Sequence, residues 1–286
     1  MEPNALISTW RRYDWRESFF APQMSILQAL TDGNRTASGV GRCRADAFHR
    51  CLGETAEIHA LQSGEVAFNP LRDGIAAHVD QNIARRAALM EAYERFAIMS
   101  WWDGHGAAAA PVQGAWLQRQ GLEQQLADGR AGAALKRRTR FWCIDAGADH
   151  PVVTICRSTS PEGQEPILGF GCDPSPTASA GKALREMLLM EMNLMELLAA
   201  RGSGQTALMG AVQRQIAAYA RYSPALLPDA PEVEPVARTA VKAEKMFGAP
   251  VHLDDITPPD GPIRVWLCRP QIVPPCVTPE RGSPFF

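Results

Sequence analysis

The chain has 286 residues, of which 46% are hydrophobic, enough to form the core of one large domain or two small ones. Its 29 basic and 31 acidic residues nearly balance, which excludes the strongly positive surface that binds duplex nucleic acid or an anionic membrane. No stretch approaches about 18 uninterrupted apolar residues, and the N-terminus lacks the pattern of a targeting signal. We therefore expect a globular, cytoplasmic protein without nucleic-acid or membrane partners.

The first part of the chain predicts an arm followed by two helices. Residues 1–37 are mixed and loop-rich, and their aromatic side chains favour a short arm packed on the body. A Gly-rich turn then leads into a helix that ends at Ser63-Gly64. Residues 65–70 form a strand-like link, and residues 70–78 are predicted as a loop. The segment 86–104 is predicted as a long helix that is apolar almost all the way round.

The middle of the chain predicts a small sheet between two helices. A surface helix is expected at about 113–128. Three short β-rich runs bounded by Gly and Pro follow at 139–145, 151–158 and 166–172. The next helix, at about 178–200, is rich in Met, which we interpret as core filler.

The C-terminal part predicts two more helices, near 206–220 and 233–246, and closing strands at 249–256 and 262–268. The tail has too much Pro for a helix or a central strand, so we expect it to be extended, on the body or reaching a partner. The predicted fold class is therefore α/β (α+β). The predicted parts are an arm (1–37), a main domain (38–270) and a tail (271–286).

The cysteines and histidines give no recognisable metal or nucleophile motif. The six histidines form no H-E-x-x-H motif. The seven cysteines include no C-x-x-C pair, which argues against a zinc knuckle or a disulfide framework, so we interpret most as small buried hydrophobes. They are Cys43, Cys51, Cys143, Cys156, Cys172, Cys268 and Cys276.

The long helix at 86–104 carries charges where an apolar helix would not need them. Glu91 and Glu94 fall on one narrow strip at about 100° per residue, and Arg95 follows directly. A buried unpaired carboxylate costs about several kcal/mol, so a cation should lie beside these two. An internal ion pair with Arg95 is one candidate, and a divalent metal ion is another.

The same acidic pattern occurs twice. The spacing A-x-x-x-x-L-x-E-x-x-E contains Glu54 and Glu57 in the first helix and Glu91 and Glu94 in the second. A third related piece, "KALRE", supplies Glu186. If these helices pack side by side, their carboxylates converge, and Mg²⁺ ions carried by nucleotide phosphates could neutralise them. Chance similarity between Ala-rich helices is the alternative.

Four stretches carry a family resemblance: "SGVGRCRADAFHRCLGETAEIHAL", "DGIAAHVDQNIARRAALMEAYERFAIMSWW", "HPVVTICRSTSPEGQEPILGFGCDPSP" and "GAPVHLDDITPPDGPIRVWLCRP". In their order and residue patterns they resemble the YcaO family. The E-x-x-E-R helix that ends in a double Trp resembles the branch that matures ribosomally made peptides.

The resemblance implies an α/β fold with a β-sheet packed against Glu-bearing helices that bind ATP and Mg²⁺. It implies phosphorylation of a backbone amide oxygen, followed by attack of a Cys, Ser or Thr side chain to give an azoline; other branches make thioamides or amidines. A precursor peptide, a partner protein that binds its leader, and a homo- or hetero-oligomer are the implied partners.

Six residues match the family motifs and are implied to bind the cofactor: Glu54, Glu57, Glu91, Glu94, Arg95 and Glu186. The five glutamates are the implied metal ligands, and Glu91, Glu94 and Arg95 are the implied catalytic residues. In this arrangement carboxylates hold the metal ions, while the metals and the arginine draw charge off the phosphates. The Walker-type phosphate-binding motif is absent from the sequence.

Several positions depart from the family pattern. These are Val40 in the Gly-rich turn, Arg50 and Ile58 in the first helix, Val79 and Ile83 before and within the second helix, and Leu189 in the third. They favour a second hypothesis, a catalytically degenerate YcaO-like subunit that binds substrate or an active partner. A third hypothesis is an unrelated α/β protein whose glutamates are structural. Our leading hypothesis is azoline formation, with thioamide formation as an alternative.

Overall fold

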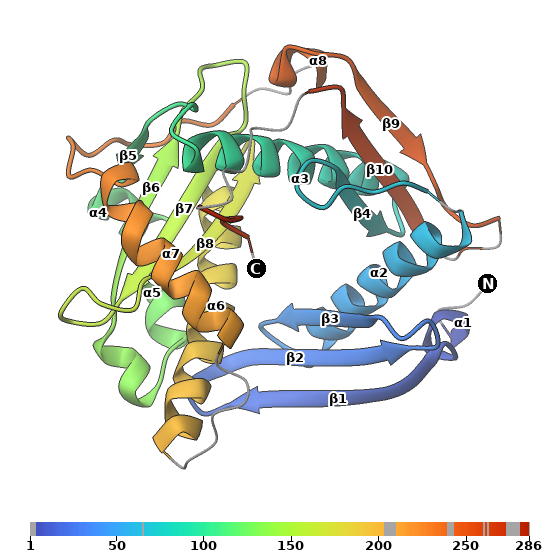
Figure 1. Cartoon of the computed structure of the whole chain (residues 1–286), viewed down its shortest axis with the longest axis horizontal. Coiled ribbons are helices and arrows are strands. Elements are labelled where there is room, and N and C mark those ends of the chain that lie inside the picture. The colour runs from blue at the N-terminus through green and yellow to red at the C-terminus, as the bar shows by residue number, and fades with distance from the viewer. Residues whose placement is uncertain are drawn as a thin grey trace. The chain divides into compact units, whose positions relative to one another are not determined.

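The computed structural model has a mixed α/β architecture, as predicted (Figure 1). It describes residues 4–64, 66–202, 210–238, 243–259, 261, 263–272 and 281–285. The chain divides into two compact units. The first unit comprises Met1–Glu17, Gln23–Arg95 and Phe247–Ile272, and the second comprises Ser18–Pro22, Phe96–Met246 and Val273–Phe286. The division into arm, main domain and tail stays a prediction.

The first unit contains two small sheets. One has the order β1-β2-β3 and is built from β1 (Trp10–Ser18), β2 (Ala21–Thr31) and β3 (Thr36–Gly41). Residues Ser18–Pro22, at the β1–β2 turn, belong to the second unit. The other has the order β4-β10-β9, in which β10 (Arg264–Pro270) pairs antiparallel with both β4 (Gly74–His78) and β9 (Val251–Asp255). The short helix α1 (Asn4–Ile7) packs on α2 (Arg44–Ser63).

Glycines let the helices of this unit lie directly on the strands. A Cβ atom at Gly39 of β3 would come within 1.8 Å of the carbonyl oxygen of Ala47 in α2. A Cβ atom at Gly74 of β4 would likewise come within 2.1 Å of the carbonyl oxygen of Ala88 in α3 (Gln81–Trp102). Only glycine tolerates such an approach, and this contact fixes which face of each helix meets its strand.

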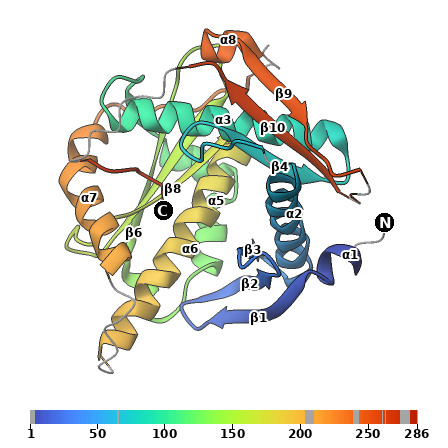
Figure 2. The same cartoon turned by 45° about the vertical axis from the view of Figure 1, so that its right-hand side comes forward.

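The second unit has one antiparallel sheet of order β5-β6-β7-β8, against which α6 (Pro176–Gly202) packs (Figure 2). Gly169 in β8 allows the same close approach of a helix to a strand, because an added Cβ atom would lie 2.3 Å from the backbone of α6. The strands are β5 (Ala109–Pro111), β6 (Arg138–Ile144), β7 (Val152–Thr159) and β8 (Ile167–Asp173). The other helices are α4 (Gly114–Arg119), α5 (Leu122–Asp128), η1 (Gly132–Lys136), α7 (Gly210–Leu226) and, at the boundary between the units, α8 (Ala243–Phe247).

A buried ion cluster ties α6 to this sheet. Glu191, which is 2% exposed, accepts hydrogen bonds from Arg130 at 2.6 and 2.7 Å and from Arg137 at 3.2 Å. The Ser158 hydroxyl donates to the same carboxylate. These buried charges are compensated within the cluster, so we interpret it as structural.

The three predicted strands of the middle segment are confirmed, and so are the long helices at 86–104 and 178–200. The loop predicted at 70–78 is wrong in part, because it contains β4, which is paired along its whole length with β10. The strand-like link is also wrong over its described residues, 66–70, which form no strand. The loop-rich description of 1–37 is wrong as well, since β1 and β2 occupy most of it.

Two predicted helices differ for local reasons. The helix at 113–128 is broken at Gly121, whose φ of 69° ends one helix before the next begins. Among the described residues of the helix near 233–246, only those of α8 are helical, and Val233 instead forms a β-bridge with Val112 beside the edge strand β5; residues 239–242 lie outside the described residues. The first residues of the helix near 206–220 lie outside the described residues, and α7 begins at 210.

The end of the tail lies on the second unit. The Trp102 indole donates to the carbonyl oxygen of Gly282, and the Tyr219 hydroxyl donates to that of Pro284 at 2.6 Å. Residues 273–280 and 286 of the predicted tail, and Cys276 with them, lie outside the described residues. Of the other cysteines, five are buried and Cys43 is exposed. In the described part of the chain, no helix is long and apolar enough to cross a membrane.

Candidate functional site

Three of the predicted site glutamates share one local geometry. Each lies on a helix and accepts a hydrogen bond from the backbone N–H of a strand residue 16 positions earlier in the chain. The donors and acceptors are Ser38 and Glu54 at 2.8 Å, Ile75 and Glu91 at 3.1 Å, and Phe170 and Glu186 at 2.7 Å. The sequence echo therefore corresponds to a repeated strand–helix unit, β3–α2, β4–α3 and β8–α6, in which the glutamate holds the helix to its strand.

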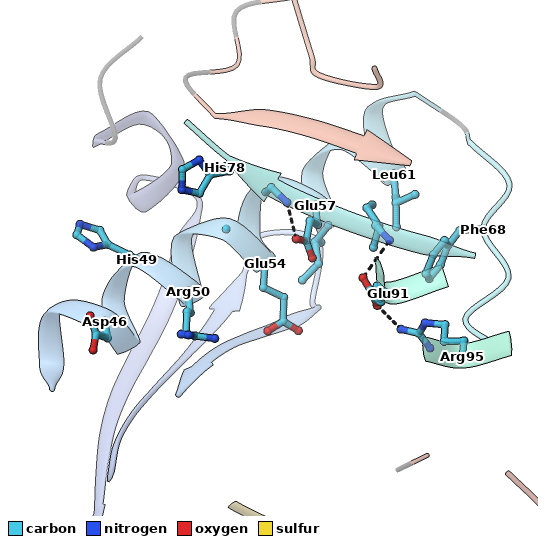
Figure 3. Close-up of a pocket in the computed structure, with 14 residues that line it drawn as sticks. Asp46, His49, Arg50, Glu54, Glu57, Leu61, Phe68, His78, Glu91 and Arg95 are labelled. Atoms are coloured by element: carbon cyan, nitrogen blue, oxygen red, sulfur yellow. Dashed lines mark hydrogen bonds and ion pairs between the residues drawn. The ribbon is translucent and has the colours of Figure 1, made fainter. Parts of the chain in front are cut away.

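Glu57 completes the acidic set of the first unit. It lies one turn after Glu54 on α2 and accepts a hydrogen bond of 2.8 Å from the backbone N–H of Ala77 in β4. Glu54, Glu57 and Glu91 line a cavity of about 700 Å³ together with Arg95. Figure 3 shows the three carboxylates directed toward this cavity from α2 and α3.

The charged forms of Glu54 and Glu57 are disfavoured in this cavity. Burial raises the pKa of Glu54, and the nearby Glu91 raises it further, although hydrogen bonds from Ser38 partly oppose this. Burial raises the pKa of Glu57 well above its ordinary value, and the charges of Glu91 and Glu54 add to the effect. Within the described residues, neither Glu54 nor Glu57 forms an ion pair. A bound cation would relieve this repulsion.

Arg95 compensates Glu91. Its Nη2 lies 2.5 Å from Oε1 of Glu91, and its Nη1 donates to the carbonyl oxygen of Pro70. The internal ion pair considered from the sequence is therefore present. This ion pair compensates the charge of Glu91, and a metal ion remains the candidate cation for Glu54 and Glu57.

The two remaining predicted metal ligands are placed differently. Glu94 is half-buried on α3 and is not among the described residues that line the cavity. Glu186 belongs to the second unit, where Phe170 holds it. The roles of Glu94 and Glu186 in metal and cofactor binding stay predictions.

The cavity also contains residues outside the predicted set of site residues. Arg50 and Ile58, noted only as departures from the family pattern, both line it, as do His49 and His78. Val79 and Ile83 are 75% and 50% exposed, so the apolar departures before and within α3 face solvent. Arg50 lies one turn before Glu54, and this i, i+4 spacing was the sequence signal that could have revealed it.

The carboxylates fit a magnesium ion only if a ligand shares it. Among the described residues, no group of three or more His, Cys, Asp or Glu side chains is arranged to hold a metal ion. Mg²⁺ commonly takes one or two protein carboxylates and completes its shell with phosphate oxygens and water. The donor set therefore fits Mg²⁺ that enters with a nucleotide, which supplies the missing ligands.

Comparison with known proteins assigns the chain to a family. A family model described as the YcaO cyclodehydratase, which binds ATP and Mg²⁺, matches residues 55–266. This match covers most of the chain, and the chain therefore belongs to the YcaO family. ATP and Mg²⁺ are the cofactors of this family, as predicted. The search of curated proteins found no match.

Solved structures support the fold. The YcaO protein of Methanopyrus kandleri, bound with AMPPCP and Mg²⁺, is 14% identical and gives a TM-score of 0.60 over 94% of this chain and 90% of its own. A heterocyclase in complex with substrate and cofactor is 13% identical, with a TM-score of 0.68 over 94% of this chain and 52% of its own. The E. coli microcin synthetase McbBCD complex with pro-MccB17 bound is 13% identical, with a TM-score of 0.62 over 94% and 89%. The predicted YcaO-like fold is confirmed.

Proposed function

We propose that this protein is an ATP- and Mg²⁺-dependent enzyme that activates a backbone amide of a ribosomally made peptide, with azoline formation as its reaction. The observation that carries the proposal is the cavity of the first unit, where a YcaO-family chain directs Glu54, Glu57 and Glu91 at one space. Such clustered acids cost stability in a protein without a cationic ligand, which favours a binding role over a structural one.

Each cavity residue has a distinct task in this proposal. Glu54 and Glu57, which form no ion pair in the described chain, hold Mg²⁺. Glu91 accepts hydrogen bonds from Arg95 and from the Ile75 N–H. Its role is therefore to hold the metal-binding side of the cavity in place. The Mg²⁺ that these carboxylates would hold supplies the positive charge that stabilises the negative charge on the phosphate oxygens during transfer.

ATP, when bound, supplies the phosphoryl group that turns the amide oxygen into a leaving group. In the overall reaction, the nucleophilic side chain forms a bond to the amide carbon and the amide oxygen departs in inorganic phosphate. ADP is the other product. The ring retains the amide nitrogen, so the peptide loses the elements of one water molecule. A thioamide product would instead need an added sulfide donor, whose sulfur takes the place of the amide oxygen that departs in inorganic phosphate.

The partners in this proposal are the precursor peptide and a protein that binds its leader. Two of the similar structures hold a substrate or a pro-peptide, and one of these is a multi-subunit complex. A homo- or hetero-oligomer belongs to the same proposal. The cavity is lined by both polar and apolar groups, among them Leu61 and Phe68, so it can accept more than a phosphate chain.

A second candidate function is a degenerate subunit that supports an active partner. The observation that favours it is Ile58, an apolar side chain that lines the cavity where the resemblance leads us to expect an arginine. Such a subunit would bind substrate or partner without phosphoryl transfer.

The deciding experiment measures ATP consumption and peptide mass together. The protein is incubated with Mg²⁺-ATP and a candidate precursor peptide rich in Cys, Ser and Thr, with and without the leader-binding protein. Peptide-dependent phosphate release with loss of one water from the peptide supports azoline formation. Matched variants are Glu57→Gln in the cavity and Glu123→Gln at an exposed position on α5, and only the first should lose activity. Partner binding without phosphate release would establish the degenerate subunit instead.

A further inference from the structure

The cavity contains an arginine, Arg50, whose guanidinium has no partner among the residues that the structure describes. Arg50 is exposed on α2 and lines the cavity of the first unit. In the parts of the chain that the structure describes, no hydrogen bond or ion pair engages its side chain. Figure 3 shows it beside Glu54, on the side of the cavity away from Arg95. Its donors are therefore available to a ligand.

Arg95, the other cavity arginine, is engaged in a different way. Its Nη1 donates to the carbonyl oxygen of Pro70, and its Nη2 is paired with Glu91. These contacts fix the α3 carboxylate and the loop before β4 relative to each other. Arg95 therefore acts first as a positioning residue, and the phosphate-binding task that the family resemblance assigns to it needs a further donor.

Arg50 is placed to provide that donor. It lies one turn before Glu54 on the same helix, and side chains at i and i+4 emerge on one face about 5–6 Å apart at Cβ. A Mg²⁺ ion shared by Glu54 and a phosphate would bring the other oxygens of that phosphate next to the same helix face. A guanidinium presents a planar fork of N–H donors that matches phosphate oxygens in pairs.

The charges that line the cavity also favour phosphate binding by Arg50. Glu54, Glu57 and Glu91 attract Mg²⁺ but repel the phosphates that accompany it, and Arg95 is paired with one of them. A polyphosphate entering this site needs a cation that the carboxylates have not already engaged. Arg50 meets this requirement, since it lies at the cavity and forms no ion pair with Glu54 in the described structure.

We propose that Arg50 binds the phosphate groups of the nucleotide directly, while Arg95 positions Glu91. The inference rests on the proposed function, because it takes the ligand to be Mg²⁺-ATP. It assigns a binding role to a residue that stands out in the sequence only as a departure from the family pattern.

Calorimetric titration with Mg²⁺-ATP and, separately, with adenosine tests this assignment on the full chain. Arg50→Ala should weaken Mg²⁺-ATP binding by about 10- to 100-fold, the range expected for loss of a charged hydrogen-bonded contact. Its affinity for adenosine should not change. Arg50→Lys keeps the charge without the fork and should fall between wild type and Arg50→Ala. Arg11→Ala, at an exposed position on β1 outside the cavity, is the control and should bind like wild type.

The outcomes separate the two proposals. Wild-type affinity of Arg50→Ala for Mg²⁺-ATP overturns the role of Arg50 and leaves the proposed function intact. An equal loss for adenosine and Mg²⁺-ATP also overturns it, because the defect would then not depend on phosphate. A wild-type protein that binds no Mg²⁺-ATP overturns both proposals. Thermal melts of each variant without ligand confirm that the fold is retained.

Discussion

Replacing Glu57 with Gln tests whether the acidic cavity exists to bind a cation. Glutamine keeps the shape of the side chain and an oxygen that can accept the hydrogen bond from Ala77, which is 2.8 Å in the wild type. It removes a carboxylate whose pKa is raised by burial and by Glu91 and Glu54. We therefore expect the variant to be more stable than wild type without ligand, and less able to bind Mg²⁺-ATP.

The two effects have opposite signs and measurable sizes. Removing a half-buried carboxylate that forms no ion pair in the described chain should raise the free energy of unfolding at pH 7 by about 1 kcal/mol or more. Saturating wild type at about 100 times its Kd should stabilise it by about 2.7 kcal/mol. If the variant binds about 10- to 100-fold more weakly, the same ligand concentration stabilises it by only about 1.4 to 0.4 kcal/mol.

The assay is a thermal melt of wild type, Glu57→Gln and the exposed control Glu123→Gln, each without ligand, with Mg²⁺ alone and with Mg²⁺-ATP. At roughly 2–4 °C per kcal/mol, wild type should gain roughly 5–10 °C with Mg²⁺-ATP. Mg²⁺ alone should have a smaller effect, since the described residues form no complete metal site. A Glu57→Gln protein that melts below wild type and keeps the full Mg²⁺-ATP shift would refute the reasoning, because the carboxylate would then be structural.

Other predictions follow from the same contacts. Glu91→Gln should lower the free energy of unfolding by about 1–2 kcal/mol in urea titrations, because it disrupts the half-buried pair with Arg95, whereas an unchanged midpoint would contradict this role. Unliganded stability should fall as pH rises from about 4 through the raised pKa values of Glu54 and Glu57, because the folded state binds these protons more tightly than the unfolded state. Thermal melts at several pH values should show a melting temperature that falls less steeply with pH in Glu57→Gln than in wild type. Glu191→Gln should destabilise by about 3–5 kcal/mol in chemical denaturation, since it leaves two buried arginines uncompensated, and a smaller loss would indicate solvent access to the cluster.

The sequence by itself determined the features that depend on local periodicity. The apolar pattern of residues 86–104 predicted a buried helix, and the β-rich runs between 139 and 172 predicted three strands. The repeated acidic spacing placed Glu54 and Glu91 at equivalent positions, and residues at matching positions of matching helices do meet their strands in the same way. The resemblance to the YcaO family also depended on sequence alone.

Tertiary structure decided which of these side chains meet. Periodicity places Glu91 and Glu94 on one strip of α3, yet of these two only Glu91 is among the described residues that line the cavity, because Gly74 brings β4 against one face of the helix and so sets its rotation. The strand β4 was missed since its five residues are too few for a clear pattern, and its pairing partner β10 lies far along the chain. The Ala77 N–H that holds Glu57 belongs to that strand. Contacts between distant segments, which no local pattern records, therefore assembled this part of the site.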